Sequence, residues 1–197
     1  MTSLNRVLIA NRGEIAIRIA RAATSLGIET VGIYSKADAQ GLHARQVDVA
    51  VELPGADPVA AYLDITSIVQ IAIDNDCDCV HPGYGFLSEN ADFARTLTER
   101  GIKFVGPSAD SLALFGDKVS ARHLATELDI PVIPGHPLAT AADALMAADK
   151  IGLPVMLKAT AGGGGRGIRA VYDRDDLEDA FARCQSEAES AFGNGAG

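Results

Sequence analysis

Strand-like and helix-like segments alternate along residues 6–105, and this alternation is the strongest constraint on the fold. A continuous apolar run at 6–10 is followed by a helical pattern that opens at Glu14 and ends near Gly27. Further helical patterns occupy 65–73 and 89–100, and the remaining strand patterns lie at 29–35, 48–53, 77–81 and 103–105. Repeated strand–helix–strand order predicts a parallel sheet covered by helices on both faces. We therefore predict an α/β fold whose first domain, residues 1–116, is doubly wound.

Two local details of this domain follow from residue spacing. The first helix is expected to face the sheet with residues at helical spacing, namely Ile15, Ile19, Ala22 and Leu26. Ser88 is expected to cap the helix that follows it.

The rest of the sequence predicts a helical linker and a small second domain. Helical patterns over 108–128 are interrupted at Gly116-Asp117-Lys118, and a stretch rich in proline and glycine follows at 131–137. Beyond it, helical patterns at 141–150 and 175–192 enclose two strand patterns at 154–158 and 168–172. We assign residues 117–130 to the linker and 131–197 to a small α+β domain.

Four consecutive glycines, at 162–165, lie between those two strand patterns, shortly after Lys158. Gly162, Gly164 and Gly167 have the spacing of a dinucleotide-binding fingerprint, but that fingerprint requires a helix directly afterwards and here a strand pattern follows, so we predict a hairpin. The run is not a Walker A loop either, because no Gly-Lys-Ser/Thr follows. Each glycine loses much backbone freedom on folding, so the run indicates a purpose. Bare backbone can offer N–H donors to a phosphate, with Lys158 nearby as a point charge. The alternative is a surface hairpin that binds nothing.

A second candidate site is the segment VHPGYGFLSEN at 80–90, which follows a strand and precedes a helix. It therefore lies at the carboxyl edge of the sheet, where ligands bind in open α/β folds. Its candidate substrate-facing residues are His81, Gly83, Tyr84, Gly85 and Glu89. For His81 and for the turn as a whole, a purely structural role is the alternative.

Arg18 and Arg21 share one face of the first helix, either as a solvated face or as a partner interface. The net charge of −9 argues against a nucleic-acid groove. The three cysteines are expected to be reduced thiols, and their spacing predicts no metal site. We find no secretory signal and no apolar run long enough for a bilayer, and expect a cytoplasmic protein.

Several segments, taken in order, resemble the N-terminal portion of biotin carboxylase. They are ANRGEIAIRI (10–19), HPGYGFLSEN (81–90), FVGPS (104–108), GDKVSAR (116–122) and KATAGGGGRGIR (158–169). The resemblance covers essentially the whole chain. It implies a pre-ATP-grasp domain followed by an ATP-grasp lid that carries the glycine-rich hairpin.

The resemblance also implies a reaction, in which ATP and bicarbonate give carboxyphosphate and biotin on a carrier protein is then carboxylated. The implied ATP-binding residues are Lys118, Lys158, Gly164 and Gly165. Arg18 and Arg21 fall where such enzymes often dimerise. The implied partners are the biotin carboxyl carrier protein and a carboxyltransferase, and the final acceptor, acetyl-CoA, propionyl-CoA, pyruvate or another, is not identified.

In this family the Mg²⁺ ligands and the main catalytic groups are expected beyond Gly197. We therefore expect no catalytic residue within this chain, and no complete active site in the chain alone. Two other functions stay open at this stage: another ATP-grasp ligase, or a non-catalytic nucleotide-binding or regulatory module.

Overall fold

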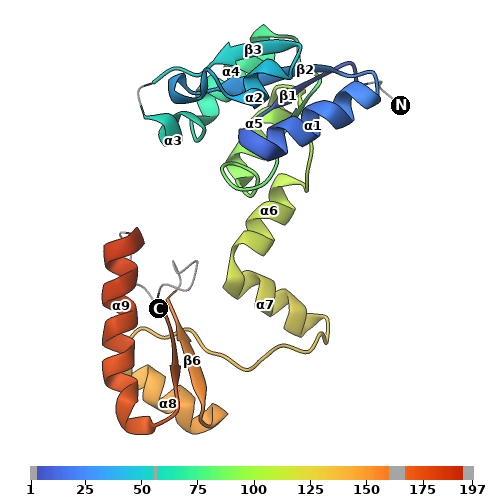
Figure 1. Ribbon diagram of the computed structural model, residues 1–197. Helices are drawn as coiled ribbons and strands as arrows, with labels where there is room; N and C mark the ends of the chain where they lie inside the picture. Colours follow the sequence, from blue (N-terminus) through green and yellow to red (C-terminus); the bar gives the residue numbers. More distant parts are fainter. Residues whose placement is uncertain (1–3, 56, 160–166, 193–197) are drawn as a thin grey trace. The chain divides into compact units, whose positions relative to one another are not determined.

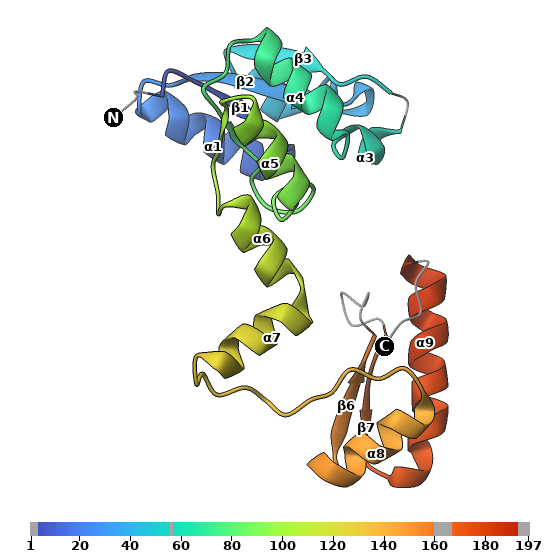
Figure 2. The same ribbon diagram turned by 180° about the vertical axis from the view of Figure 1, so that it is seen from behind.

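The computed structural model describes residues 4–55, 57–159 and 167–192. It divides into two compact units, Met1–Ala121 and Arg122–Gly197, which Figure 1 and Figure 2 show from opposite sides. The division falls within the helix α7 (Lys118–Glu127). The domain boundaries at residues 116 and 130 stay predictions.

A parallel sheet of five strands, in the order β3-β2-β1-β4-β5, forms the first unit. Its strands are β1 (Arg6–Ile9), β2 (Glu29–Tyr34), β3 (Val49–Glu52), β4 (Cys79–His81) and β5 (Lys103–Phe104). Its helical segments are α1 (Gly13–Ser25), η1 (Lys36–Asp38), α2 (Leu42–Arg45), α3 (Pro58–Ala61), α4 (Ile65–Asp74), α5 (Ala91–Glu99) and α6 (Ala109–Gly116). The strand order reverses between β1 and β4, so the topological switch point lies there.

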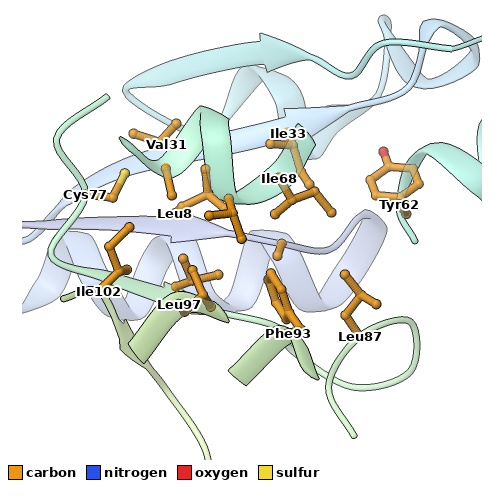
Figure 3. Packing of buried hydrophobic residues seen from close by; sticks show 14 of the residues in the cluster. Leu8, Val31, Ile33, Tyr62, Ile68, Cys77, Leu87, Phe93, Leu97 and Ile102 are labelled. Atoms are coloured by element: carbon orange, nitrogen blue, oxygen red, sulfur yellow. The ribbon is translucent and has the colours of Figure 1, made fainter. Parts of the chain in front are cut away.

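Successive residues of β1 face opposite helical layers, because side chains alternate along a strand. Leu8 packs into a core that includes buried residues of α4 and α5, which Figure 3 shows from close by. Its neighbours Val7 and Ile9 pack on the other side, against residues of α1. Helices therefore cover both faces of the sheet, which confirms the predicted doubly wound α/β architecture.

α1 buries only part of the predicted face: Ile19 is buried and Ile15 packs against the same cluster, whereas Ala22 and Leu26 do not. Its buried residues are Ala16, Ile19, Ala20 and Ala23. Leu26, in contrast, is 75% exposed and follows the last helical residue as its C-cap, and Ala22 is also exposed. Alanines let the helix approach the sheet closely, so small side chains rather than the largest apolar ones mark the packed face.

A polar network joins the segments that follow β1 and β2. Arg12 Nε and Nη2 donate to Asp38 Oδ2 and Oδ1 at 2.7 and 2.5 Å. Asp38 Oδ2 also accepts from Ser35 Oγ at 3.1 Å and from Tyr62 Oη at 3.0 Å. The Arg12 guanidinium lowers the pKa of Asp38 to about 2, and burial raises the pKa of Tyr62 to about 12.

The second unit is a β-hairpin packed against two helices. Its elements are α8 (Ala141–Ile151), β6 (Val155–Lys158), β7 (Ile168–Val171), η2 (Arg174–Asp176) and α9 (Leu177–Phe192). β6 and β7 are antiparallel, with Val155 opposite Val171 and Lys158 opposite Ile168. The core between the hairpin and the helices contains Leu157, Val171, Leu177 and Cys184, with Ala144 and Ala148 of α8.

All three cysteines are buried and free. Burial raises the pKa of the Cys77 thiol to about 12 and that of Cys79 to about 11, so both are protonated at neutral pH. Within the described ranges, no helix is long and apolar enough to cross a membrane.

Leu97 of α5 provides a test of the core. It is fully buried, so Leu97→Ala is expected to lower the free energy of unfolding by about 3 kcal/mol through lost contacts and a residual cavity. Leu26→Ala is the matched control, because Leu26 is 75% exposed, and a change below about 0.5 kcal/mol is expected. Urea denaturation measures both, and equal effects would contradict the burial assigned to α5.

Asp38 provides a test in pH. Its folded pKa of about 2 lies below the reference value of 3.8, so its charge stabilises the fold above about pH 4, and this is lost as the pH falls toward 2. Asp38→Asn is expected to cost about 1–2 kcal/mol at pH 7, allowing for solvent around Arg12. Urea denaturation across pH 2–7 should show the difference shrinking below pH 4, and a difference independent of pH would contradict the assignment.

Candidate functional site

One buried amide occupies the switch point between β1 and β4. Asn11 directly follows Ala10 at the end of β1 and is 3% exposed. Its Nδ2 donates to the carbonyl oxygens of Pro82 and Tyr84 at 2.6 and 2.8 Å. Both hydrogens of the Asn11 side-chain amide therefore form hydrogen bonds, and these bonds hold the segment after β4 against the end of β1.

The segment 81–86 follows a strongly curved path. Gly83 and Gly85 both have a φ of +68°, and a Cβ at Gly83 would lie 2.7 Å from Asn11 Nδ2. Glycine is therefore required at position 83 on two grounds, backbone conformation and close approach. His81 Nδ1 accepts from the Gly83 N–H at 3.1 Å. Burial lowers the pKa of His81, which favours the neutral ring needed for this bond and gives His81 a structural contact.

Within residues 80–90, Tyr84 and Glu89 present exposed side chains, and Tyr84 is 64% exposed. The predicted cap at Ser88 is wrong. Asn90 caps α5, accepting from the Phe93 N–H at 2.8 Å. Ser88 instead lies in a turn, where its N–H bonds to the Gly85 carbonyl at 2.9 Å, so the helix begins later than predicted. The substrate-facing roles of His81, Gly83, Tyr84, Gly85 and Glu89 stay predictions.

The hairpin of the second unit has one packed face and one open face. Val155 and Leu157 point into the core, so the alternate residues Met156 and Lys158 point outward, and both are exposed. Ile168 lies opposite Lys158 in the register and is half-buried. Lys158 therefore stands beside an apolar surface. Sequence reasoning identified the lysine but missed Met156 and Ile168, although the strand alternation of VMLK indicates which residues share its face.

The two strands stay paired up to the ends of the described hairpin. The Ala159 N–H donates to the Gly167 carbonyl at 2.8 Å, directly after Lys158. On the other side, the Gly167 N–H donates to Glu187 Oε2 of α9 at 3.3 Å. The predicted phosphate-binding glycines Gly164 and Gly165 lie outside the described residues.

Lys118 is the first residue of α7 and is exposed. The side chain of the preceding Asp117 accepts from the Ser120 N–H at 2.6 Å, which is a cap at the helix start. The predicted break between two helices at Gly116-Asp117-Lys118 is confirmed. Lys118 belongs to the first unit and Lys158 to the second, so the nucleotide-binding role of each stays a separate prediction.

The outer face of α1 carries Arg18 and Arg21, as predicted from spacing. Arg18 forms an exposed ion pair with Glu14, with Nη2 and Oε1 2.8 Å apart. Arg21 Nη2 lies 3.5 Å from Gln46 Oε1. Four residues of α1 line a hollow on the surface: Glu14, Ile17, Arg18 and Arg21.

No metal cluster is found among the residues that the structure describes: nowhere do three or more His, Cys, Asp or Glu side chains come close enough to hold an ion. The acidic groups described above are engaged with N–H or O–H donors, as Asp38 and Asp117 illustrate.

Residues 3–112 match the family described as "Biotin carboxylase, N-terminal domain". Residues 117–196 match the family described as "Carbamoyl-phosphate synthase L chain, ATP binding domain". Pyruvate carboxylase of Staphylococcus aureus is 50% identical over 198 aligned residues, which cover 98% of this chain and 17% of that protein. The chain thus spans about a sixth of the length of this curated relative.

Two crystal structures resemble the chain as a whole. One is the biotin carboxylase domain dimer of 2-oxoglutarate carboxylase from Hydrogenobacter thermophilus, with MgADP, ADP and bicarbonate. It gives a TM-score of 0.92 at 40% identity, covering 100% of this chain and 44% of that one. The other is a biotin carboxylase complex with β-γ-ATP from Campylobacter jejuni, with a TM-score of 0.91 at 42% identity, covering 98% of this chain and 44% of that one.

The first family match spans more than half of the chain, includes Asn11 and the segment that Asn11 holds at the switch point, and agrees with the folds of these two relatives. On this evidence the chain belongs to the biotin carboxylase family.

Proposed function

We propose that this chain supplies part of the nucleotide-facing and substrate-facing surface of an ATP-dependent ligase that carboxylates biotin on a carrier protein. Carboxyphosphate formed from ATP and bicarbonate is the proposed intermediate. The observation that carries the proposal is the open face of the β6–β7 hairpin, where Lys158 stands beside Met156 and Ile168.

This face matches the chemistry of a nucleotide. An adenine ring needs an apolar surface to lie on, and a polyphosphate needs a cation. Met156 is 55% exposed, so its side chain is available for such a contact, while Lys158 provides charge within a chain of net charge −9. Lys118, Gly164 and Gly165 are proposed as further nucleotide-binding residues on the resemblance alone.

The ligands bound in the two related crystal structures support this ligand set. One contains MgADP, ADP and bicarbonate, and the other a β-γ-ATP. We assign no described residue to Mg²⁺, because none of the described carboxylates belongs to a cluster that fits an ion. A bound Mg²⁺ would neutralise phosphate charge during phosphoryl transfer.

The segment after β4 is proposed to face bicarbonate or biotin. Its backbone is fixed by Asn11 at two carbonyl oxygens, while the Tyr84 side chain projects with 64% of its surface exposed. A fixed backbone with an open aromatic side chain suits recognition of a small substrate at this edge of the sheet.

We propose pyruvate as the final carboxyl acceptor, because the curated relative with 50% identity is a pyruvate carboxylase. Acetyl-CoA and propionyl-CoA are the alternatives, and an assay of the carboxylated product distinguishes them. The proposed partners are a biotin carboxyl carrier protein or domain and a carboxyltransferase.

A second candidate is another ATP-grasp ligase, which the match of residues 117–196 to a carbamoyl-phosphate synthase domain favours. The match of residues 3–112 to a biotin carboxylase domain favours the first candidate. In the full-length protein that contains this chain, ATP hydrolysis that requires both bicarbonate and biotin supports the first, whereas hydrolysis with bicarbonate that is unaffected by biotin supports the second. A non-catalytic module would bind nucleotide tightly without metal and without hydrolysis.

Lys158→Gln is expected to weaken ATP binding by about tenfold to a hundredfold, because it removes a charged hydrogen-bond donor. Lys150→Gln is the control, since Lys150 is an exposed lysine in the last turn of α8 in the same unit, and no change is expected. Isothermal titration calorimetry of the purified protein with ATP measures both. Equal affinities for the two variants would remove the main support for the proposed function.

The outer face of α1 is proposed as a homodimer interface, since one related structure is a biotin carboxylase domain dimer. Replacing both arginines, Arg18→Glu with Arg21→Glu, is expected to convert the dimer to monomer, because it reverses two charges on this face in each copy and so makes the two acidic faces repel each other. Arg95→Glu is the control, because Arg95 is also exposed and ion-paired, on α5. Sedimentation velocity distinguishes the outcomes, and a dimer that survives the double substitution would place the interface elsewhere.

A further inference from the structure

Glu187 of α9 contacts two residues at the start of β7. Its Oε2 accepts from the Gly167 N–H at 3.3 Å, and its Oε1 accepts from Arg169 Nη2 in an ion pair. One carboxylate therefore connects α9 to the hairpin at two points that are separated by a single residue, Ile168.

Gly167, which directly precedes β7, is hydrogen-bonded both to the residue that follows β6 and to α9. It is buried, with a φ of +69°, and its carbonyl accepts from the Ala159 N–H at 2.8 Å. A hydrogen-bonded path thus runs from Glu187 through Gly167 to Ala159, the residue that follows Lys158. The position of Lys158 along the hairpin depends on this path.

The guanidinium of Arg169 is partly buried, and its ion pair with Glu187 compensates its charge. Arg169 lies opposite Leu157 in the register and so points to the packed side of the hairpin. Its Nε is buried and has no hydrogen-bond partner among the described residues. The guanidinium is thus partly desolvated, and the Glu187 carboxylate compensates its charge. Loss of that carboxylate would leave a cation against the core formed by Leu157 and Cys184.

We infer that Glu187 is a positioning residue for the nucleotide site, which fixes the end of β6 and the start of β7 so that Lys158 and Ile168 stay side by side on the open face of the hairpin. The inference rests on the proposed function for its ligand. Glu187 itself lies on the packed side of the hairpin and touches Gly167 and Arg169, so it acts through them.

Glu187→Gln tests this role, because the amide keeps the size of the side chain and loses its charge. We expect ATP to bind about tenfold more weakly to the purified protein, and the Gly167 N–H to exchange faster with solvent. Glu187→Asp keeps the charge and is expected to restore part of the affinity. Asp149→Asn is the matched control, since it removes another ion pair of this unit, Arg174–Asp149, with Nε and Oδ1 3.0 Å apart.

Calorimetry with ATP, hydrogen exchange and thermal unfolding are measured on all three variants. The inference predicts that Glu187→Gln and Asp149→Asn unfold at similar temperatures while only the former loses affinity and protection at Gly167. Equal ATP affinity in these two variants would overturn the role of Glu187 alone. Absence of ATP binding by the unsubstituted full-length protein that contains this chain would overturn the proposed function, and the ligand role of Glu187 with it.

Discussion

The pairing of β1 with both β2 and β4 is the constraint on which the first unit depends. Because the three strands are parallel, their carboxyl ends meet at one edge, and residues far apart in the sequence become neighbours there. Asn11, Ser35 and His81 each lie at or directly beyond the end of one of these strands. β1 in the middle must be apolar toward both helical layers, which the sequence RVLI provides.

The side chains of the adjacent residues Asn11 and Arg12 point in opposite directions at this edge of the sheet. Asn11 turns inward, and its amide donates to the carbonyl oxygens of Pro82 and Tyr84. Arg12 turns toward solvent and binds Asp38, which Tyr62 and Ser35 hold in place. The inward residue sets the path of the segment that carries Tyr84, and the outward one ties the ends of β1 and β2 together. The edge is therefore rigid in its backbone while Tyr84 remains exposed.

The fold was largely predictable from sequence, because strand and helix patterns alternate clearly and their order admits few topologies. The errors arose where size and hydrophobicity mislead: Leu26 is large yet lies past the end of α1, and the packed face consists mainly of alanines. Ser88 looked like a cap, but a preceding turn delays the helix to Asn90. Lys158 was identified beside the glycines, and the alternation of VMLK places Met156 on the same face, whereas Ile168 requires the hairpin register and Glu187 requires the packing of α9. Such contacts between distant segments leave no local sequence signal.

The hairpin register also decides which cation is available to a ligand. Arg169 and Lys158 occupy opposite faces of the same two strands. Arg169 points to the packed side and is paired with Glu187, whereas Lys158 points outward and has no ion-pair partner among the described residues. A shift of one strand by a single residue would move its side chains to the other face. The pairing of Arg169 with Glu187 opposes such a shift, because the shift would carry a half-buried cation away from the carboxylate that compensates its charge. The same ion pair that neutralises one cation therefore keeps the other on the open face.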